Sequence, residues 1–185
     1  MNNVEIRRPK IDDKGELHQF FRKVISDTFA NEGLMDEVNE IENEIQNKIK
    51  YLNMDFESNG AKSYFLLALV NEQVIGTIEY GLASDLINEG INGALKELVE
   101  IGTVFVLPTY QRQGIGNLLL NVMYITLLNK GIKEFYLDSG YTNAQKIWKK
   151  KFGKPDYFLK DFWGEGYDHM IWRKKIENMP ILFKI

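Results

Sequence analysis

The sequence predicts a single domain that mixes helices and strands, of the α/β or α+β class. Its 185 residues suit one domain of ordinary size. With 44% hydrophobic and 26% charged residues, the composition is typical of a globular protein with a core. Segments with the two-residue period of strands alternate along the chain with segments that have the period of helices. We find no internal repeat and no low-complexity linker, so one mixed sheet flanked by helices is the simplest architecture.

The chain begins with a predicted strand and a predicted helix. Residues 4–8 alternate in polarity and are followed by a proline, which predicts a short strand. Asp12 or Asp13 can cap the helix that follows, and Glu16 stands where it would complete a capping box with Asp13. Its apolar residues recur at helical spacing: Leu17, Phe20, Phe21, Val24, Ile25 and Phe29.

A second helix is predicted after Gly33, with one apolar side and one acidic side. The apolar stripe consists of Leu34, Val38, Ile41, Ile45, Ile49 and Leu52. The acidic side consists of Asp36, Glu37, Glu40, Glu42 and Glu44. Two interpretations remain open: a solvated helix face, or an acidic rim that attracts a cationic substrate.

Three strands are predicted in the middle of the chain. Residues 64–70 are too apolar for an exposed strand and too few for a helix, so we expect a buried strand. A turn at 71–73 joins it to a second strand at 74–80, which gives a hairpin. Residues 81–97 indicate a loop with a short helix, and residues 98–107 form a strand that a proline stops.

The remaining elements follow a polar loop that carries glycines. Residues 117–130 predict an apolar helix ending at Gly131, and residues 134–138 predict a strand. A lysine-rich helix is expected at 143–152 and a last strand at 169–175.

Composition excludes several kinds of chemistry. The chain has no cysteine, so disulfides, thiolate nucleophiles and cysteine-ligated zinc are impossible. Two histidines far apart, His18 and His169, argue against a histidine-rich metal site, and we expect no metal. A net charge of −3 and a pI of 5.5 argue against nucleic acid as the main partner. No apolar run is long enough to span a membrane and no signal core begins the chain, so we expect no membrane partner and a cytoplasmic location.

The stretch most informative about chemistry joins the strand at 98–107 to the apolar helix. The first N–H groups of a helix lack internal partners and lie at the positive end of its dipole, so they form an anion site. Gly114 and Gly116 remove side chains that would block the approach of a phosphate. Leu119 stands where the dinucleotide-binding fingerprint needs a third glycine, and the Gly-Lys-Ser/Thr of the P-loop is absent.

The residues of this stretch resemble a motif of the GNAT N-acetyltransferase superfamily. The loop Gln111-Arg112-Gln113-Gly114-Ile115-Gly116 is similar to that family's pyrophosphate loop, Gln/Arg-x-x-Gly-x-Gly/Ala. The preceding Val104-Phe105-Val106-Leu107-Pro108 resembles the family's apolar-x-Val-x-Pro strand end. The order of the following elements, with Asn143-Ala144 in the next helix, also fits. The resemblance is strong from about Leu98 to Gly153 and looser on either side.

This resemblance implies a mostly antiparallel mixed sheet splayed at the fourth strand, with acetyl-CoA in the gap. It divides the chain, 1–185, into N-terminal and acceptor-side elements at 1–97, an acetyl-CoA-binding core at 98–153 and C-terminal strands at 154–185. It assigns cofactor contacts to Val104, Phe105 and Val106 on the strand, to Gln111, Arg112, Gln113, Gly114, Ile115, Gly116 and Asn117 in the loop, and to Asn143. Within that set, the Val104 amide would hold the thioester oxygen, and Asn143 is alternatively a helix N-cap.

The implied reaction is direct acetyl transfer to a primary amine of a small molecule or a peptide. An alkylammonium has a pKa of about 10.4, so a base must take a proton before nitrogen attacks. Glu100 begins the fourth strand, where several family members carry a glutamate base, and Glu79 ends the neighbouring strand. For either residue an ordinary exposed or ion-paired carboxylate is the alternative interpretation.

The general acid is less defined because the chain departs from the family pattern. Where many members carry a tyrosine, the nearest aromatic residue is Trp148, whose indole cannot act as an acid near neutral pH. The helix also ends in Phe-Gly where the family usually has Gly-Phe. Tyr141 and Tyr157 are candidate acids, and an unassisted thiolate is the other option.

Several features leave the function open at this stage. The lysines at 146, 149, 150, 151 and 154 either contact the 3′-phosphate of coenzyme A or form a solvated face. The aromatic residues from Tyr157 to Tyr167 can line an acceptor pocket, fill a core or form a homodimer contact. A non-catalytic acyl-CoA sensor and a protein-interaction module on the same fold are the alternatives to an enzyme.

Overall fold

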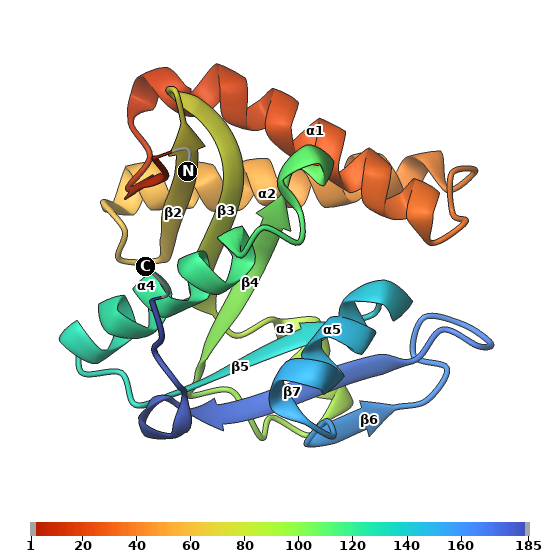
Figure 1. Ribbon diagram of the computed structural model, residues 1–185. Coiled ribbons are helices and arrows are strands. Elements are labelled where there is room, and N and C mark those ends of the chain that lie inside the picture. The colour runs from red at the N-terminus through yellow and green to blue at the C-terminus, as the bar shows by residue number, and fades with distance from the viewer. Residues whose placement is uncertain (1–2, 184–185) are drawn as a thin grey trace.

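The computed structural model describes residues 3–183 and contains a seven-stranded sheet with helices on both faces (Figure 1). The strands are β1 (Glu5–Arg7), β2 (Ser63–Val70), β3 (Gln73–Leu82), β4 (Val99–Val106), β5 (Glu134–Ser139), β6 (Tyr157–Leu159) and β7 (His169–Lys175). The helices are α1 (Lys14–Asn31), α2 (Val38–Ser58), α3 (Asp85–Gly90), α4 (Ile115–Asn129) and α5 (Thr142–Phe152). Single 3-10 turns lie at Ile11–Asp13, Pro108–Tyr110 and Ile176–Asn178.

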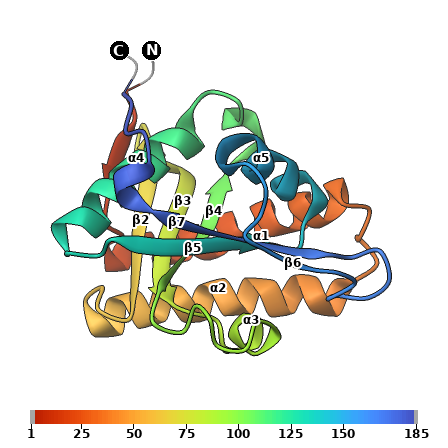
Figure 2. The same cartoon turned by 90° about the horizontal axis from the view of Figure 1, so that it is seen from below.

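The sheet is splayed between its fourth and fifth strands. The strand order is β1-β2-β3-β4-β5-β7-β6, and every pairing is antiparallel except that of β4 with β5. This parallel pair joins only Val99 to Phe135 and Glu100 to Tyr136. Beyond these residues the strands diverge, so that β5, β7 and β6 turn away from β2, β3 and β4 (Figures 1 and 2). The predicted splay at the fourth strand is confirmed.

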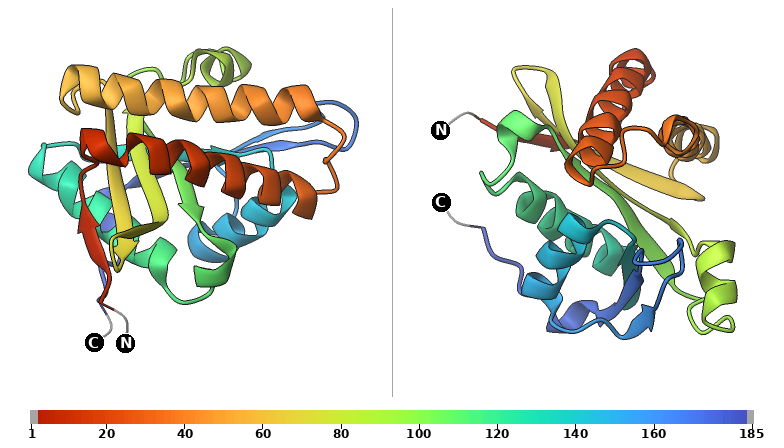
Figure 3. Two further views of the ribbon diagram at one scale, coloured as in Figure 1. Left: turned by 90° about the horizontal axis from the view of Figure 1, so that it is seen from above. Right: turned by 90° about the vertical axis from the view of Figure 1, so that its right-hand side faces the viewer.

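Helices cover the first half of the sheet from both sides. Helices α1 and α2 lie across one face and α4 lies on the other (Figure 3). On the first face the rings of Phe21 and Phe65 are 6.1 Å apart, and on the second those of Tyr124 and Phe135 are 5.5 Å apart. Because β2 is covered on both sides, its sequence is a continuous apolar run rather than an alternating one.

Strand β4 contains a bulge at its centre. Thr77 of β3 faces Phe105 and Glu79 faces Gly102, so β4 has one residue more than β3 between these pairs. Thr103 takes up the extra length with φ of +51°, a conformation that is rare for a threonine. The Thr77 hydroxyl donates a hydrogen bond of 2.9 Å to the Thr103 carbonyl and fixes the bulge. The bulge therefore lies in the part of β4 that has passed its pairing with β5, which ends at Glu100.

The predicted order of helices and strands is confirmed, and the differences concern the ends of elements. The predicted capping box at Asp13 is wrong: its carboxylate accepts from Arg7 and from the Lys10 amide instead. Glu16 accepts from the Val74 amide of β3, at 2.7 Å. In both cases a partner from another element competed successfully with the local cap.

Three further boundaries differ from the prediction. Helix α2 begins at Val38 and continues to Ser58, so Val38 lies in the first turn and is 67% exposed instead of on the apolar stripe. Helix α4 begins at Ile115, two residues early, because Gly114 is its N-cap. Strand β4 is one residue shorter at each end than the predicted 98–107, whereas the three-residue strand β6 is one of the strands expected at 154–185.

Asp55 of α2 ties the N-terminus to the sheet. It is fully buried, forms an ion pair with Arg8 and accepts a 2.5 Å hydrogen bond from the Phe65 amide.

We expect Asp55→Ala to lower the free energy of unfolding by about 3 kcal/mol, because it removes the carboxylate that pairs with the buried Phe65 amide and with Arg8. Urea unfolding followed by circular dichroism measures this change. Arg22→Ala, which breaks an exposed ion pair with Glu42, is the matched control and should change stability little. Equal effects of the two variants would contradict this account.

Candidate functional site

Two carboxylates meet around a glycine at the opening of the splay. Glu79 on β3 and Glu100 on β4 lie on the face of the sheet that α2 covers. A Cβ atom built on Gly102 would lie 3.5 Å from Glu79 Oε1 and 3.6 Å from Glu100 Oε1. Because position 102 has no side chain, a small space remains between the two carboxylates. Both predicted bases are thus brought to one place.

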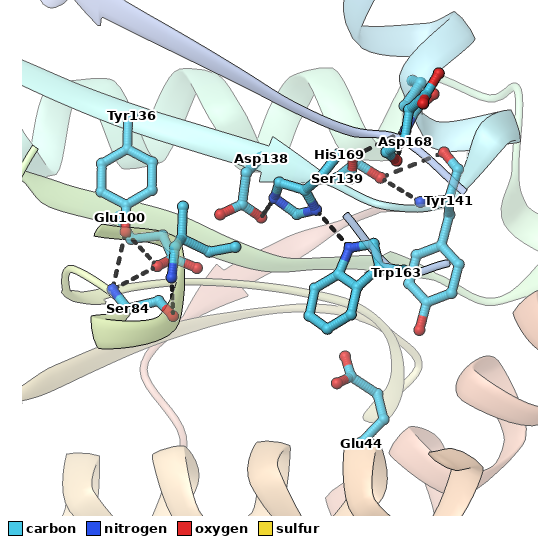
Figure 4. Close-up of polar contacts among 12 residues, drawn as sticks. Glu44, Ser84, Glu100, Tyr136, Asp138, Ser139, Tyr141, Trp163, Asp168 and His169 are labelled. Atoms are coloured by element: carbon cyan, nitrogen blue, oxygen red, sulfur yellow. Dashed lines mark hydrogen bonds and ion pairs between the residues drawn. The ribbon is translucent and has the colours of Figure 1, made fainter. Parts of the chain in front are cut away.

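Glu100 is held by hydrogen bonds to its other oxygen. The Tyr136 hydroxyl donates to Glu100 Oε2 at 2.6 Å, and the Ser84 amide donates to the same atom at 3.1 Å (Figure 4). Burial raises the pKa of Glu100 to about 8, and the nearby carboxylate of Asp138 acts in the same direction. The hydrogen bond from Tyr136 opposes this rise without cancelling it. Glu100 is therefore a partly buried carboxyl group whose pKa is raised toward neutral pH.

Glu79 has the same arrangement on the neighbouring strand. Its Oε2 accepts a hydrogen bond of 2.9 Å from the Ser63 hydroxyl, and the residue is only 5% exposed. Burial raises the pKa of Glu79 to about 7, while the charge of Lys48 and the bond from Ser63 oppose the rise. In both glutamates Oε2 is anchored and Oε1 faces the space above Gly102.

Lys48 of α2 supplies a cation to this site, and the sequence analysis missed it. Its ammonium lies 3.1 Å from Glu44 Oε1, and its side chain is 15% exposed. Burial disfavours the charged lysine, but the carboxylates of Glu44 and Glu79 outweigh it and raise the pKa of Lys48. The signal was available: Lys48 lies three residues after Ile45 and four before Leu52, where the spacing calls for an apolar residue.

At the other end of β4, the predicted loop forms the N-terminus of α4. Gly114 is the N-cap with φ of +89°, and Arg112 also has a left-handed φ of +60°. Leu118 is the first residue whose amide closes a helical hydrogen bond, to the Gly114 carbonyl at 3.0 Å. The amides of Ile115, Gly116 and Asn117 are therefore the free donors of a helix N-terminus.

The side chains of this loop brace it rather than fill it. The side-chain amide of Gln111 donates to the Val106 carbonyl at 3.1 Å, and the side-chain amide of Gln113 donates to the Thr109 carbonyl at 2.9 Å. Lys151 of α5 donates to Asn117 Oδ1 at 2.7 Å. One member of the predicted lysine cluster thus stands beside the anion-binding end of α4, and the loop itself carries no carboxylate.

The predicted strand positions lie on the open edge. Val104, Phe105 and Val106 follow the last residue of β4 that pairs with β5, and each is partly buried. Within residues 3–183 no strand pairs with them on the β5 side, and the Val106 carbonyl accepts from the Gln111 side chain, so another extended chain can hydrogen-bond along this edge. Val104 comes directly after the bulged Thr103.

Tyr141 and Asn143 lie at the start of α5, close to the end of α1. Tyr141 is the N-cap of α5, so the alternative that Asn143 is an N-cap is wrong. The Glu32 carboxylate fills that role from outside by accepting from the amides of Thr142 at 3.0 Å and Asn143 at 2.8 Å. The Asn143 side chain donates to the Asn31 carbonyl at 3.4 Å. Asn143 therefore helps to dock α5 on α1.

Only one of the two candidate acids is near the splay. The ring of Tyr141 packs edge-on against Phe29, 5.6 Å between centroids, and its hydroxyl is on the side of Glu44 (Figure 4). Burial, with Glu44 acting in the same direction, raises the pKa of Tyr141. Tyr157 lies on β6, which β7 separates from β5. Trp148 stacks on Phe152 at 5.7 Å, as part of the α5 packing.

A comparison with family models decides the assignment. Residues 27–153 match the model of the acetyltransferase (GNAT) family. The chain belongs to the GNAT family. A search of curated proteins by sequence gave no match. As a GNAT-type enzyme, the chain is an N-acetyltransferase by family, and its seven-stranded mixed sheet is the sheet of that fold.

Solved structures agree with this assignment. A GNAT-family acetyltransferase from Desulfovibrio desulfuricans superposes with a TM-score of 0.71 at 16% identity, over 94% of this chain and 99% of the other. The PaiA N-acetyltransferase of Thermoplasma acidophilum in complex with coenzyme A has a TM-score of 0.67 at 25% identity, over 94% and 99%. A ribosomal-protein-alanine N-acetyltransferase from Brucella melitensis has a TM-score of 0.65 at 19% identity, over 92% and 99%.

The raised pKa values of the two carboxyl groups make stability depend on pH. Between about pH 4.5 and 8 the unfolded glutamates lose their protons while the folded ones keep them, so stability falls as pH rises. We expect Glu100→Gln to reduce this fall by roughly 1–3 kcal/mol. Urea unfolding of the wild type and of Glu100→Gln at pH 5 and pH 8.5 measures this change in stability. Parallel curves for the variant and the wild type would show that Glu100 ionises normally.

Proposed function

We propose that this GNAT protein transfers an acetyl group from acetyl-CoA directly to a primary amine of a small molecule or a peptide. The observation that carries the proposal is the pair of glutamates, Glu79 buried and Glu100 partly buried, each with one free oxygen facing the space above Gly102. An amine that enters this space meets groups able to accept its proton. Strand β4, with its open edge, continues through the glycine loop into the N-terminus of α4.

The residues present fit acetyl-CoA. The unpaired edge of β4 offers backbone groups near Val104 and Val106 to the pantetheine arm, as an added strand would be bound. The amides from Arg112 to Asn117 would hold the pyrophosphate at the end of the α4 dipole. The loop glycine at 114 supplies the left-handed turn and leaves the amides accessible. Coenzyme A in the Thermoplasma structure supports this choice of co-substrate.

Glu79 and Glu100 are the proposed bases. An ordinary carboxylate is a weak base toward an ammonium of pKa about 10.4, and a carboxylate whose pKa is raised is a stronger one. The hydrogen bonds from Ser63, and from Tyr136 and Ser84, fix each carboxylate through Oε2 and leave Oε1 for the substrate. The proton then moves from nitrogen to Oε1, either directly or through a water.

The remaining steps use the strand and α5. The Val104 amide, beside the bulge, would stabilise the negative oxygen that develops when nitrogen attacks the thioester. Tyr141 would donate a proton to the departing thiolate. Its hydroxyl is protonated at neutral pH, and burial, which raises its pKa, makes it a weaker acid than an exposed tyrosine. The chain contains no cysteine, so an acyl-cysteine intermediate cannot form and transfer is direct.

Other parts of the interpretation stay predictions. These are the cytoplasmic location, the homodimer, the absence of nucleic acid and membrane partners, and the division at residues 97 and 153. Among the helices described within residues 3–183, none has the length and apolarity needed to cross a membrane. The side chains that the structure describes include no cluster of three or more histidine, aspartate or glutamate residues suited to a metal.

Glutamine substitutions test the bases. We expect the wild type to release coenzyme A thiol with some amine of a broad panel, at a rate that rises with pH up to about 8. Of the two variants Glu100→Gln and Glu79→Gln, the one that replaces the base should lower kcat by roughly 10²–10⁴-fold. A thiol-specific dye measures release, and the protein itself contributes no thiol. Unchanged turnover and pH profile in both variants would exclude this assignment. Acetyl-CoA binding without turnover of any amine would indicate the acyl-CoA sensor.

A glycine substitution tests the loop. Gly114→Trp should abolish acetyl-CoA binding, measured by calorimetry, because the indole covers the helix N-terminus. Gly131→Trp is the matched control: both glycines have positive φ and no neighbouring atom within 4 Å, but Gly131 lies at the opposite end of α4. Both variants should lose similar stability, and only the first should lose binding. Equal loss in both would place the site elsewhere.

A further inference from the structure

A third carboxylate, Asp138, lies across the splay from the two glutamates. Asp138 is two residues beyond Tyr136 on β5, so both side chains are on the same face of the strand. Tyr136 donates to Glu100, and this places Asp138 on the face that carries the paired glutamates. Asp138 also lies beyond the last residue of β5 that pairs with β4. Its Oδ2 is buried and has no hydrogen-bond partner among the residues that the structure describes.

A chain of polar contacts, of which the first is a hydrogen bond, leads from Trp163 through His169 to Asp138 (Figure 4). The Trp163 indole N–H lies 2.9 Å from His169 Nδ1. Because an indole nitrogen can only donate, His169 Nδ1 must be an unprotonated acceptor. The proton of the neutral imidazole is therefore on Nε2. Nε2 lies 3.6 Å from Asp138 Oδ1, so its N–H is directed at that carboxylate.

Trp163 holds the His169 ring through Nδ1, and Asp138 is the polar group that Nε2 approaches within the described part of the chain. The His169 side chain is 4% exposed, and Nε2 has no hydrogen-bond partner there. A separation of 3.6 Å is slightly too long for a hydrogen bond, so a small movement of Asp138 would close it. A buried donor and a buried acceptor oxygen thus remain unsatisfied beside the splay, which is costly unless a ligand uses them.

The loop before β7 presents Trp163 in a fixed position. The Asp161 carboxylate accepts from the Gly166 amide at 2.7 Å, and the Trp163 amide donates to the Tyr167 carbonyl at 3.1 Å. Gly140, after β5, makes room for the indole: a Cβ atom there would lie 2.7 Å from Trp163 Nε1. Half of the Trp163 side chain is exposed, and Figure 4 shows its ring on the side of Glu44 and Tyr141.

We propose that Asp138 is the anionic anchor for an alkylammonium group of the acceptor, with His169 and Trp163 as the residues that position it. The inference rests on the proposed function only in naming this ligand as the acceptor. The Asp138 carboxylate binds the cation through Oδ2, while the imidazole N–H holds Oδ1. A pantetheine amide is the other group that could reach Asp138, and the tests separate the two.

The first experiment tests the chain without reference to activity. Two-bond ¹H–¹⁵N spectra report the imidazole tautomer, and the protein has only two histidines, so His18→Gln assigns the signals. We expect His169 to be the neutral Nε2–H tautomer at pH 7.5. Trp163→Phe should move the Nδ1 resonance, because it removes the indole donor and retains the ring. An Nδ1–H tautomer, or a spectrum that Trp163→Phe does not change, would overturn the arrangement.

The second experiment tests the ligand. Calorimetry with n-butylammonium, in the presence of saturating coenzyme A, measures binding of the cation to the complex. Asp138→Asn should weaken it roughly 10- to 100-fold, with coenzyme A affinity unchanged, because it removes a charge-assisted contact. Asp156→Asn, which changes an exposed carboxylate paired with Lys174, is the control and should bind as the wild type does. Weaker coenzyme A binding with unchanged amine binding would assign Asp138 to the pantetheine and overturn the inference.

A double-mutant cycle separates positioning from packing. Trp163→Phe should weaken amine binding in the wild type and have no further effect in Asp138→Asn. Independent, additive effects would mean that Trp163 is only a wall of the pocket. If an amine of the panel is acetylated and its KM does not respond to Asp138→Asn, the inference fails and the proposed function stands. If no amine is acetylated but n-butylammonium binding depends on Asp138, the proposed function fails and the inference stands.

Discussion

The short pairing of β4 with β5 is the constraint on which the site depends. Two residue pairs, ending at Glu100 and Tyr136, join the halves of the sheet, and beyond them each strand keeps an unpaired edge. Longer pairing would close the edge of β4 and remove the place where an extended ligand can bind. Shorter pairing would separate Tyr136 from Glu100 and release the carboxylate that it holds at 2.6 Å. The bulge at Thr103 lies directly beyond this junction, so the strand changes direction where the splay begins.

Electrostatics at this junction oppose stability. Glu79, Glu100 and Asp138 are three carboxylates around one opening, and burial makes the ionisation of the two glutamates costly. Lys48 compensates only in part, since Glu44 also binds it. A protein that needed only a stable core would place apolar residues here, as α2 does at Ile45 and Leu52. The cost is consistent with a site that must accept a proton near neutral pH.

The parts that the sequence predicted are those with local causes. The pattern of polar and apolar residues, together with chain-breaking residues, was enough to predict the strand at 64–70, the turn after it and the strand at 169–175. The glycine loop was predicted from its sequence motif. Contacts between distant elements were not accessible. Lys48 meets Glu79 only because α2 crosses β3, and Asp138 meets His169 only because β5 and β7 pair in the observed register. The bulge left one sign, Gly102 inside a strand, which is a common mark of a bulge.

Strand β4 orders the proposed chemistry along its length. Glu100 and Gly102 lie near its start on the face toward α2, the bulge and Val104 follow, and the loop that ends at Gly116 continues from its far end. Gly102 and Val106 face Glu79 and Gly76, three residues apart on β3, so at about 3.3 Å per residue they are separated by about 10 Å, and the amine space and the anion site cannot be occupied by the same group. An acceptor near Gly102 and an extended co-substrate along the edge can therefore be present together, as direct transfer requires. Thr103 lies between Gly102 and the open edge that begins at Val104, and its left-handed backbone is fixed by Thr77. The reacting centre would lie beside Thr103.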